Sequence, residues 1–468
     1  MAATRMEGYK LFQEGMRTLS VIEHNGVRID VPYLKATSER IGAEMRGIET
    51  RMRADPTYDV WRKRFGEKSN IQSVTQLAQV LYKDLGYEVK ALTATGRAKA
   101  DDEALADIDL PFVQDYCRLK DLGKLRGTYL KGVLYHTVDG FLHPNFNLHT
   151  VQTYRSSCSE PNLQNVPVRN PEVMQAIRRA FIARKGRVLV EVDFSGVEVR
   201  VAACYTKDPN LIRYIKDPTT DMHRDTACDL FFLTPEQVDK KTHRDSAKNQ
   251  WVFPEFYGSV FFQCAANIWK ALTKRKFKVG DVTMLKWLRQ HGVKELGDCD
   301  PKADARQGTF VGHCKEVERI MWEERFAGYT AWKKSWYAAY RRDGGFDTLT
   351  GFHIEGLLSR NQVLNYPIQG SAFHCLLWAL NRVQAVVEKR KMKTLLVGQI
   401  HDSMLADVPE NELQEYLDIT HDVITRQLPK AWDWIIVPIE AESEVCSGGT
   451  WADKKQWTKQ NGTWAEKP

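Results

Sequence analysis

The sequence predicts an α/β protein of the α+β kind, in which many helices surround a small set of strands. Hydrophobic residues recur at intervals of three and four over long stretches, which is typical of amphipathic helices. Short apolar runs typical of strands occupy 188–193 and 395–400, and the second run begins an expected hairpin over 394–408. With 468 residues, the chain is long enough for two or three domains or for one large multi-lobed fold.

The expected helices follow from this periodicity and from capping or turn residues at their ends. Ser73 is expected to cap one helix at its start, and Gly86 to end it. The helix over 110–134 carries basic residues that either lie along a phosphate backbone or form a solvated face. The predicted helices are 1–60 with a turn at 24–26, 71–87, 110–134, 196–206, 313–342, 361–391 and 410–427, and residues 221–270 are expected to be mostly helical.

The remaining segments are predicted to be a strand, a loop region and an insertion. Residues 437–442 have the pattern of a further strand, and residues 143–170 are polar and loop-like. Residues 270–310 are first basic, at Lys274–Lys278, and then rich in Gly and Asp. We therefore expect an insertion or a mobile subdomain there.

Composition narrows the class of protein. Hydrophobic residues make up 43% and charged residues 27% of the chain, an ordinary globular balance. The net charge of +7 and the pI near 8.8 favour an acidic partner such as nucleic acid. The longest stretch without charged residues, 361–381, is too polar to span a bilayer, so no membrane contact is expected. The N-terminus does not resemble a signal peptide, and nine scattered cysteines without a Cys-x-x-Cys pair indicate a reducing, cytoplasmic location.

Two aspartates stand where strand-like runs end. Asp193 closes the run that begins at Val188, and Asp402 follows the run that ends at His401. Carboxylates at adjoining strand ends could hold a pair of Mg²⁺ ions, which clamps both the attacking and the leaving oxygen of a phosphoryl transfer. Phosphoryl transfer is therefore the chemistry that these residues predict.

Glu198 has two interpretations. Ser195 and Glu198 fit the Ser-x-x-Glu pattern of a capping box for the following helix. The alternative places Glu198 beside the sugar of an incoming nucleotide.

A second group of residues suits a nucleotide. Arg244 and Lys248 are four residues apart on one helical face, and aromatic residues follow, which suits a triphosphate and its base. The alternative is an ordinary solvated face. Pro254 predicts that the helix kinks or ends near Phe253.

Asn365 and Gln369 are also four residues apart, at the start of a predicted helix. They either contact bases or backbone in a nucleic-acid groove or merely cap that helix.

Taken in order, these motifs resemble those of family A DNA polymerases, the group that includes bacterial DNA polymerase I and many bacteriophage replicative enzymes. The matching segments are 23–30, 124–130, 155–167, the three core motifs around Asp193, Lys248 and Asp402, and 365–370. Any one of them could be accidental, but the ordered set is specific and spans nearly the whole chain.

The resemblance implies a right-hand fold with palm, fingers and thumb and an antiparallel palm sheet. The implied divisions are an N-terminal palm-associated segment at 1–60, the thumb at 61–140, the palm at 141–204 and 361–468, and the fingers at 205–360 with the insertion near 270–310.

The resemblance also implies a template-directed DNA polymerase that adds dNTPs to a primer 3′-OH by two-metal-ion phosphoryl transfer. The implied cofactor is two Mg²⁺ ions, with Mn²⁺ as a substitute, and the partners are primer–template DNA and dNTPs. Because only a short segment precedes the first motif, we expect no 3′–5′ exonuclease in this chain and a separate exonuclease or processivity factor as a partner. A phage-type replicative role is expected, in the host cytoplasm if the protein is phage-encoded.

Individual roles follow from the same resemblance. The implied catalytic residues are Asp193, Asp402 and Lys248, and the implied metal ligands are Asp193, Phe194 and Asp402. The implied nucleotide-binding residues are Arg244, Lys248, Phe253, Tyr257, Glu198 and His223, with Glu198 as the gate against a ribose 2′-OH. The implied primer–template contacts are Arg155, Asn162, Gln164, Asn165, Lys124, Thr128, Asn365, Gln369 and His401.

The chain departs from the family pattern in four places. Ser403 stands where a glutamate often follows the second aspartate, and Asp245 stands where a second arginine is common. One extra residue between Lys248 and Tyr257 leaves open whether Val252 or Phe253 packs on the incoming sugar. The segment 270–310 has no family counterpart that we can place.

Two other functions compete with this one. A single-subunit RNA polymerase-like nucleotidyltransferase uses similar metal carboxylates, but a bulky Glu198 beside the sugar would exclude ribonucleotides. A non-catalytic nucleic-acid-binding relative would have no need to keep Asp193, Lys248 and Asp402 together.

Overall fold

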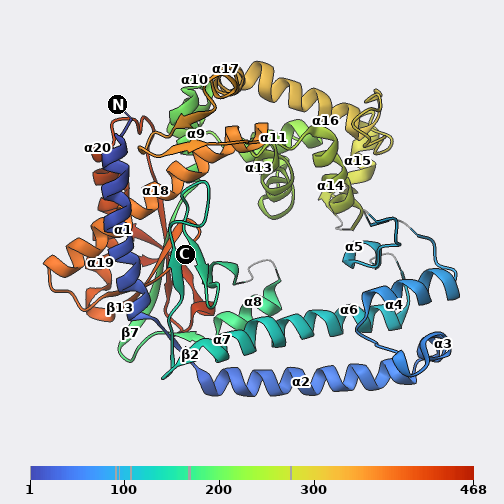
Figure 1. The fold of residues 1–468 in the computed structure, drawn as a ribbon. Coiled ribbons are helices and arrows are strands. Elements are labelled where there is room, and N and C mark those ends of the chain that lie inside the picture. Colours follow the sequence, from blue (N-terminus) through green and yellow to red (C-terminus); the bar gives the residue numbers. More distant parts are fainter. Residues whose placement is uncertain are drawn as a thin grey trace.

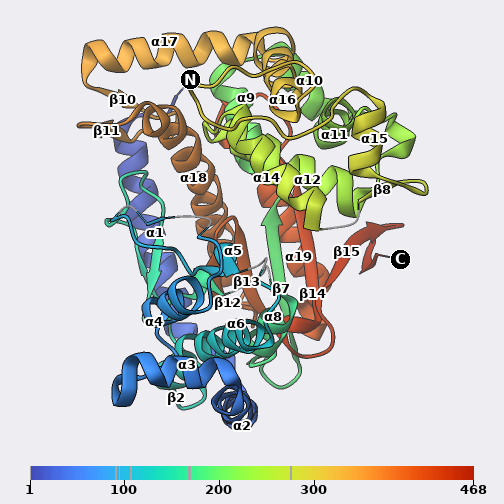
Figure 2. The ribbon, with the colours of Figure 1, turned by 90° about the vertical axis from the view of Figure 1, so that its right-hand side faces the viewer.

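A six-stranded antiparallel sheet forms the centre of the fold (Figures 1 and 2). The computed structural model describes residues 2–89, 92–93, 95–105, 108–166, 170–274 and 277–467. In sheet order the strands are β12 (Leu395–Ile400), β13 (Ser403–Pro409), β7 (Arg187–Phe194), β14 (Ala441–Cys446), β15 (Lys455–Gln460) and β16 (Thr463–Glu466). The prediction of a helix-rich α+β fold is confirmed.

The strand β7 is buried because helices and neighbouring strands surround it. Leu189, Val190 and Val192 have no exposed surface, so this strand reads as an apolar run rather than an alternating one. The helix α1 (Arg5–Asn25) packs on β12 and against α18 (Arg360–Lys389), which reaches β13 together with α19 (Leu413–Asp422). These helices lie beside the sheet in Figure 1.

A long helical arm extends away from the sheet along the bottom of Figure 1. There α2 packs along α6, and both are amphipathic. The helices of this part are α2 (Val31–Ala54), α3 (Pro56–Phe65), α4 (Val74–Gln79), α5 (Asp102–Leu105), α6 (Pro111–Lys124) and α7 (Lys131–His136), with π-helical turns at Val80–Asp84 and Leu125–Leu130. Ser73 caps α4 through the Gln76 amide, as predicted.

Smaller sheets connect these parts. A four-stranded sheet in the order β2-β3-β1-β6 joins the arm to the central sheet region. The short strands are β1 (Val27–Ile29), β2 (Thr137–Val138), β3 (Phe141–Leu142), β4 (Asn145–Asn147), β5 (Ser157–Ser159), β6 (Phe181–Ile182), β10 (Gly345–Asp347) and β11 (His353–Glu355). Apart from β4, β5 and one 3₁₀ turn, the described part of 143–170 is irregular, as expected.

A second group of helices lies across the top of Figure 1, opposite the arm. Its helices are α9 (Val197–Thr206), α10 (Pro209–Lys216), α11 (Met222–Phe231), α12 (Asp245–Ala247), α13 (Phe253–Phe256), α14 (Phe261–Lys274), α15 (Met284–Gln290), α16 (Phe310–Arg319) and α17 (Ala327–Asp343). The remaining helices are α8 (Pro171–Arg178) and α20 (Leu428–Ala431).

The single helix predicted over 313–342 is wrong. After α16 and a π-helical turn at Ile320–Arg325, Phe326 leaves the helix with φ −119° and ψ 47° before α17 begins. Phe326 is fully buried, and its ring packs near Phe256 and Tyr214. Core packing of one aromatic ring therefore divides a segment whose periodicity is continuous.

The strand predicted over 437–442 is displaced, because β14 begins only at Ala441. Two carbonyls before it accept hydrogen bonds from other elements: Arg200 donates to Pro438 O at 2.6 Å, and the Ser195 amide donates to Glu440 O at 3.0 Å. Pro438 also has no amide hydrogen for a strand ladder.

The expected insertion at 270–310 is packed onto the protein. It contains β8 (Lys278–Val279), β9 (Val282–Thr283) and α15, with Phe277, Met284 and Leu288 buried. Two residues of its basic run, Arg275 and Lys276, lie outside the described residues, as does Pro167 at the end of the 155–167 motif.

The extra residue between Lys248 and Tyr257 is accommodated by a wider helical turn. Lys248–Val252 form a π-helical turn between α12 and α13, and a π-turn carries one more residue than an α-turn. The Phe253 amide bonds to Lys248 O across this turn, and the chain stays helical through Pro254 to Phe256. The helix therefore does not end at Phe253.

No helix in the described ranges has both the length and the hydropathy needed to cross a membrane.

The close approach of α18 to the segment before β5 gives a stability prediction. A Cβ atom at Gly370 would lie 2.5 Å from the Thr153 carbonyl oxygen, which is backbone and cannot rotate away. We expect Gly370→Ala to lower the free energy of unfolding by about 1–3 kcal/mol in urea titrations. The control is Gly132→Ala in α7, where a Cβ would meet nothing within 4 Å and where a gain of about 0.5–1 kcal/mol is expected. Equal effects of both substitutions would contradict the prediction.

Candidate functional site

Asp193 and Asp402 lie at one end of the central sheet, on adjoining strands. Asp193 is next to last in β7 and pairs in register with Ser403, the first residue of β13. Asp402 lies in the tight turn between β12 and β13, where the Phe194 amide donates to the Asp402 carbonyl at 3.1 Å. The predicted juxtaposition of two carboxylates at strand ends is therefore present.

The two carboxylates form an under-compensated negative charge. Burial, followed by the charges of Asp402, Glu191 and Glu442, raises the pKa of Asp193 to about 8. Burial also raises the pKa of Asp402, and Arg155, whose Nη2 lies 3.7 Å from Asp402 Oδ1, opposes that shift. Such a site is electrostatically suited to a divalent cation.

The donor set fits Mg²⁺ rather than a softer metal. Within the described ranges, no group of three or more His, Cys, Asp or Glu side chains is arranged to hold a metal by itself. Two carboxylates, with the main chain at Phe194 beside them, leave coordination positions for waters and phosphate oxygens. Mg²⁺ is commonly bound in this way, through one or two carboxylates plus substrate phosphates.

Glu191 is a carboxylate near this site that the sequence analysis missed. Its Oε1 lies 3.0 Å from the hydroxyl of Ser403, the residue that stands where the family often has glutamate. Its Oε2 accepts from Trp451 Nε1 at 2.8 Å and from Lys454 at 3.1 Å. Position 403 thus has a hydroxyl in place of a carboxylate, and the carboxylate of Glu191 on β7 lies beside it. The sequence signal for Glu191 was a glutamate inside an apolar strand.

The capping-box interpretation of Glu198 is wrong. Gly196, with φ of +59°, is the N-cap residue of α9, and no side chain caps this helix. The one-residue shift removes Ser195 from the cap position, and its hydroxyl instead lies 3.1 Å from Glu442 Oε1. Glu198 is therefore free to face the site.

Glu198 connects the helix after β7 to two other segments. Arg155 Nη1 lies 3.2 Å from Glu198 Oε1, and the Tyr257 hydroxyl donates to Glu198 Oε2. Burial raises the pKa of Glu198, and burial together with the Glu198 charge raises the pKa of Tyr257. In this conformation the phenol of Tyr257 therefore closes over the carboxylate.

Most predicted site residues line one cavity of about 400 Å³. Those that line it are Arg155, Asp193, Phe194, Glu198, Lys248, Phe253, Tyr257, Asn365, Gln369, His401 and Asp402. The sequence left open whether Val252 or Phe253 packs on an incoming sugar. Phe253 lines this cavity, whereas Val252 is fully buried.

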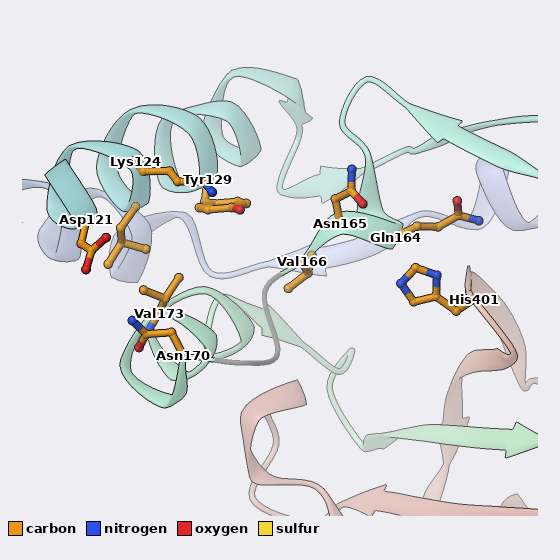
Figure 3. A pocket seen from close by; sticks show the side chains of 10 residues that line it. Asp121, Lys124, Tyr129, Gln164, Asn165, Val166, Asn170, Val173 and His401 are labelled. Atoms are coloured by element: carbon orange, nitrogen blue, oxygen red, sulfur yellow. The ribbon is translucent and has the colours of Figure 1, made fainter. Parts of the chain in front are cut away.

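A second cavity of about 370 Å³ lies between the helical arm, α8 and the β12–β13 turn (Figure 3). Lys124 and Tyr129 approach it from the arm, while Gln164, Asn165 and His401 line the other side. Thr128 and Asn162 are exposed and lie close in sequence to these lining residues, but they line neither cavity.

Two cations of the basic face predicted on 110–134 are paired with carboxylates. Arg118 pairs with Glu44 at 2.7 Å and with Glu172 at 2.6 Å. Lys120 pairs with Asp102 at 2.8 Å. Of this series, Lys124 is the cation that lines the second cavity.

Arg244 and His223 lie just outside the lining of the first cavity. Lys248 Nζ lies 5.4 Å from the centre of the Phe253 ring, and His223 meets the same ring edge-on at 5.7 Å. One turn earlier, Arg244 Nε donates to Asp221 at 2.7 Å. Lys248 therefore lines the cavity and Arg244 lies one turn away, on the same helical segment, as their spacing predicted.

Asn365 contacts the residue that ends α13 and does not cap α18, the helix to which it belongs. Its amide donates to the Tyr257 carbonyl at 2.8 Å, while Ser359 caps α18.

Gln164 donates to Gln399 at 2.8 Å, and Gln399 in turn donates to the His401 carbonyl at 2.7 Å. This chain of amides supports the turn that carries Asp402.

Comparison with known proteins identifies relatives over most of the chain. A sequence model described as DNA polymerase family A matches residues 32–276 and 324–453. The unmatched residues 277–323 include most of the expected insertion. The chain is 30% identical over 466 residues to "DNA polymerase I, thermostable" of Thermus filiformis, and 27% identical over 455 residues to "DNA polymerase I" of Bacillus subtilis.

These alignments cover 95% of this chain but only 48% and 46% of the two relatives, so the chain spans about half their length. A solved structure described as "POL domain of Pol1 from M. smegmatis complex with DNA primer-template and dNTP" superposes with a TM-score of 0.72 at 24% identity. It covers 94% of this chain and 70% of that chain. The chain therefore has this polymerase-domain fold, as the sequence predicted.

The raised pKa of Asp193 predicts a pH-dependent stability in metal-free buffer. Between the usual pKa of Asp193, near 3.8, and its folded pKa of about 8, folding requires Asp193 to take up a proton. The free energy of unfolding of wild type therefore falls as pH rises through this range. Asp193→Asn removes this proton uptake, and the stability that it gains over wild type should grow by up to about 1.4 kcal/mol per pH unit between pH 5 and 8. Urea titrations with EDTA at both pH values measure this gain. A gain that is independent of pH would contradict the assignment.

Proposed function

Because the chain belongs to DNA polymerase family A, we propose that it is a template-directed DNA polymerase that adds dNTPs to a primer 3′-OH. The observation that carries the proposal is the pair Asp193 and Asp402, fixed at adjoining strand ends in a cavity that also contains Lys248. Two fixed carboxylates and a nearby cation suit a reaction that depends on positioning and charge stabilisation.

In this proposal, Asp193, Asp402 and the main chain at Phe194 hold two Mg²⁺ ions, for which Mn²⁺ can substitute. When bound, the metal pair stabilises charge on the attacking and leaving oxygens. Lys248, Arg244 and His223 receive the triphosphate, and the cations stabilise the charge that develops on the departing pyrophosphate. Phe253 packs on the incoming sugar.

Primer–template contacts are proposed for the residues around the second cavity and the turn at His401. Arg155 lines the first cavity, Gln164, Asn165 and Lys124 line the second, and His401 lines both. Thr128 and Asn162 are exposed on the same segments. We propose that Tyr257 lies near the templating base, and that Asn365 and Gln369 on α18 contact the primer–template. Lysine and arginine would contact phosphates, and the amides would contact base edges.

The helical parts are proposed as subdomains of a right hand. The central sheet with α1, α9 and α18 is the palm, and α10 to α17, within the predicted 205–360, are the fingers. The predicted boundary between 1–60 and the thumb at 61–140 needs revision, since α1 packs on the palm whereas α2 packs along α6. We therefore begin the thumb at α2.

The alternatives are distinguished by substrate. A single-subunit RNA polymerase-like enzyme would accept rNTPs, and a binding-only relative would not extend a primer. A phage-type replicative role and a separate exonuclease or processivity partner stay predictions; the relatives named above are bacterial.

Primer extension tests the proposed activity. With a labelled primer–template, Mg²⁺ and dNTPs, wild type should extend the primer, and Asp402→Ala or Asp193→Ala should reduce the rate by at least about 10³-fold, because each removes charge stabilisation of the transition state. DNA binding, measured by fluorescence anisotropy, should stay within a few-fold of wild type. Extension at an unchanged rate would overturn the metal assignment, and salt-sensitive binding by a wild type without extension would favour the binding-only relative.

Sugar selection tests the role of Glu198. Glu198→Ala should reduce discrimination against rNTPs on the order of 10²-fold, because the space beside the sugar would admit a 2′-OH. Glu198→Gln, which keeps the bulk and loses the charge, is the matched variant and should retain most of the discrimination. The measurement is the ratio of kcat/KM for a dNTP and its rNTP. An unchanged ratio in the Ala variant would assign sugar selection to another residue.

A further inference from the structure

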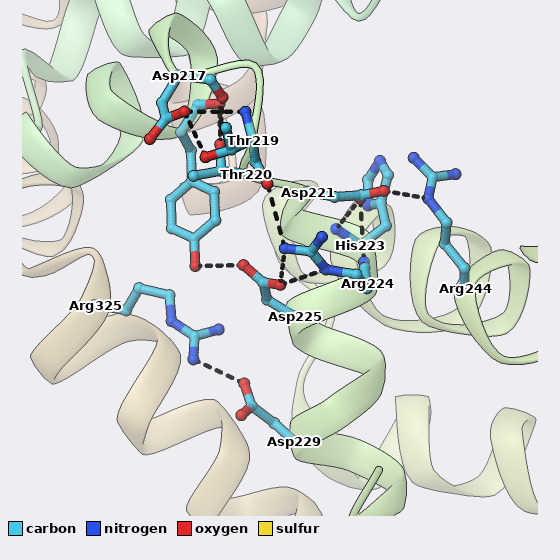
Figure 4. Close-up of polar contacts among 11 residues, drawn as sticks. Asp217, Thr219, Thr220, Asp221, His223, Arg224, Asp225, Asp229, Arg244 and Arg325 are labelled. Carbon is cyan, nitrogen blue, oxygen red and sulfur yellow. Dashed lines mark hydrogen bonds and ion pairs between the residues drawn. The ribbon is translucent and has the colours of Figure 1, made fainter. Parts of the chain in front are cut away.

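We propose that Asp221 is a positioning residue that holds Arg244 ready for the triphosphate of the incoming nucleotide. This inference rests on the proposed function. Asp221 is the N-cap residue of α11, and its Oδ1 accepts the backbone amides of His223 and Arg224, each at 3.1 Å. Its Oδ2 accepts from Arg244 Nε at 2.7 Å (Figure 4). One carboxylate thus connects the start of α11 to the helix that carries Lys248.

The geometry of this pair leaves the useful end of Arg244 open. Asp221 takes only the Nε hydrogen, and neither terminal nitrogen of Arg244 has a hydrogen-bond partner among the described residues. Those two nitrogens form the fork with which a guanidinium binds phosphate oxygens. The Arg244 side chain is 32% exposed, so the fork is accessible while its stem is held.

His223 shows that Arg244 and Lys248 act on the same region. Its ring meets Phe253 at 5.7 Å, and its Nδ1 is buried without a partner in the described structure. Burial, and then the positive charges of Arg244 and Lys248, lower the pKa of His223 to about 4. Both cations therefore act on the same imidazole, and Asp221 fixes His223, through its backbone amide, and Arg244, through its side chain.

Other carboxylates on α11 provide an internal comparison. Asp225 and Asp229 follow Asp221 at intervals of four residues, but their partners differ. Asp225 pairs with Arg224 at 2.9 Å, and Asp229 pairs with Arg325 at 2.8 Å. Of these three carboxylates, Asp221 is the one that bonds Arg244. Asp229→Asn therefore removes an ion pair from the same helix without touching the nucleotide residues.

The test is Asp221→Asn, which separates capping from positioning. Asparagine caps helices as well as aspartate does, so α11 should keep its start. Its amide nitrogen cannot accept from Arg244 Nε, so the guanidinium loses its fixed orientation. The expected result is a rise of about 3- to 10-fold in KM for dNTPs, the cost of ordering one long side chain on binding, with a smaller change in kcat. Asp229→Asn should leave KM unchanged.

A double-mutant cycle shows whether Asp221 acts through Arg244. In the Arg244→Ala background, Asp221→Asn should cause no further rise in KM, because the residue that it positions is gone. A full additional rise in that background would assign Asp221 a structural role. A KM that is unchanged or lower in the single variant would also overturn the proposal, since a lower KM means that Asp221 restrains Arg244.

Equilibrium titration with dGTP and Mg²⁺ keeps the inference testable without primer extension. If wild type binds dGTP but extends no primer, the proposed function fails, and weaker dGTP binding by Asp221→Asn still supports the inference. If wild type extends primers and Asp221→Asn binds dGTP like wild type, the inference fails and the proposed function stands. If wild type neither binds nor extends, both are overturned.

Discussion

The antiparallel pairing of β7 with β13 is the constraint on which the site depends. Seven residue pairs, from Asp193 with Ser403 to Arg187 with Pro409, set the register. Because side chains alternate between the two faces of a strand, a slip of one residue would turn Asp193 away from the turn that carries Asp402. The buried contact between Ser403 and Glu191 links the same two strands and makes such a slip costly.

The register concentrates negative charge at one end of the central sheet, and the nearby cations come from segments outside the sheet. Arg155 precedes β7 and lines the cavity, and Lys248 lines it from the helical segment that also carries Arg244. None of them neutralises Asp193 directly, so the raised pKa of Asp193 expresses a cost to the metal-free fold. Sites that carry out chemistry commonly sacrifice stability in this way.

The helix from Lys240 to Phe256 shows how one extra residue is absorbed near such a site. A π-turn at Lys248–Val252 widens the helix, leaves Lys248 and Phe253 on the cavity side, and buries Val252 in the core. π-turns are frequent at functional sites because they change the direction of a side chain without ending the helix. The departure from the family spacing is therefore compatible with the same arrangement of side chains.

Local signals in the sequence determined the strand ends at Asp193 and near Asp402, the cap at Ser73, the helical spacing of Arg244 and Lys248, and the ordered motifs. These depend on residues that are close along the chain. Partners distant in sequence decided the rest: the burial of Phe326, the carbonyl partners that delay β14, the contact of Glu198 with Tyr257, and the place of Glu191. Ser403 and Glu191 are 212 residues apart. Periodicity carries no information about such a pair, because only the sheet register brings the two side chains together.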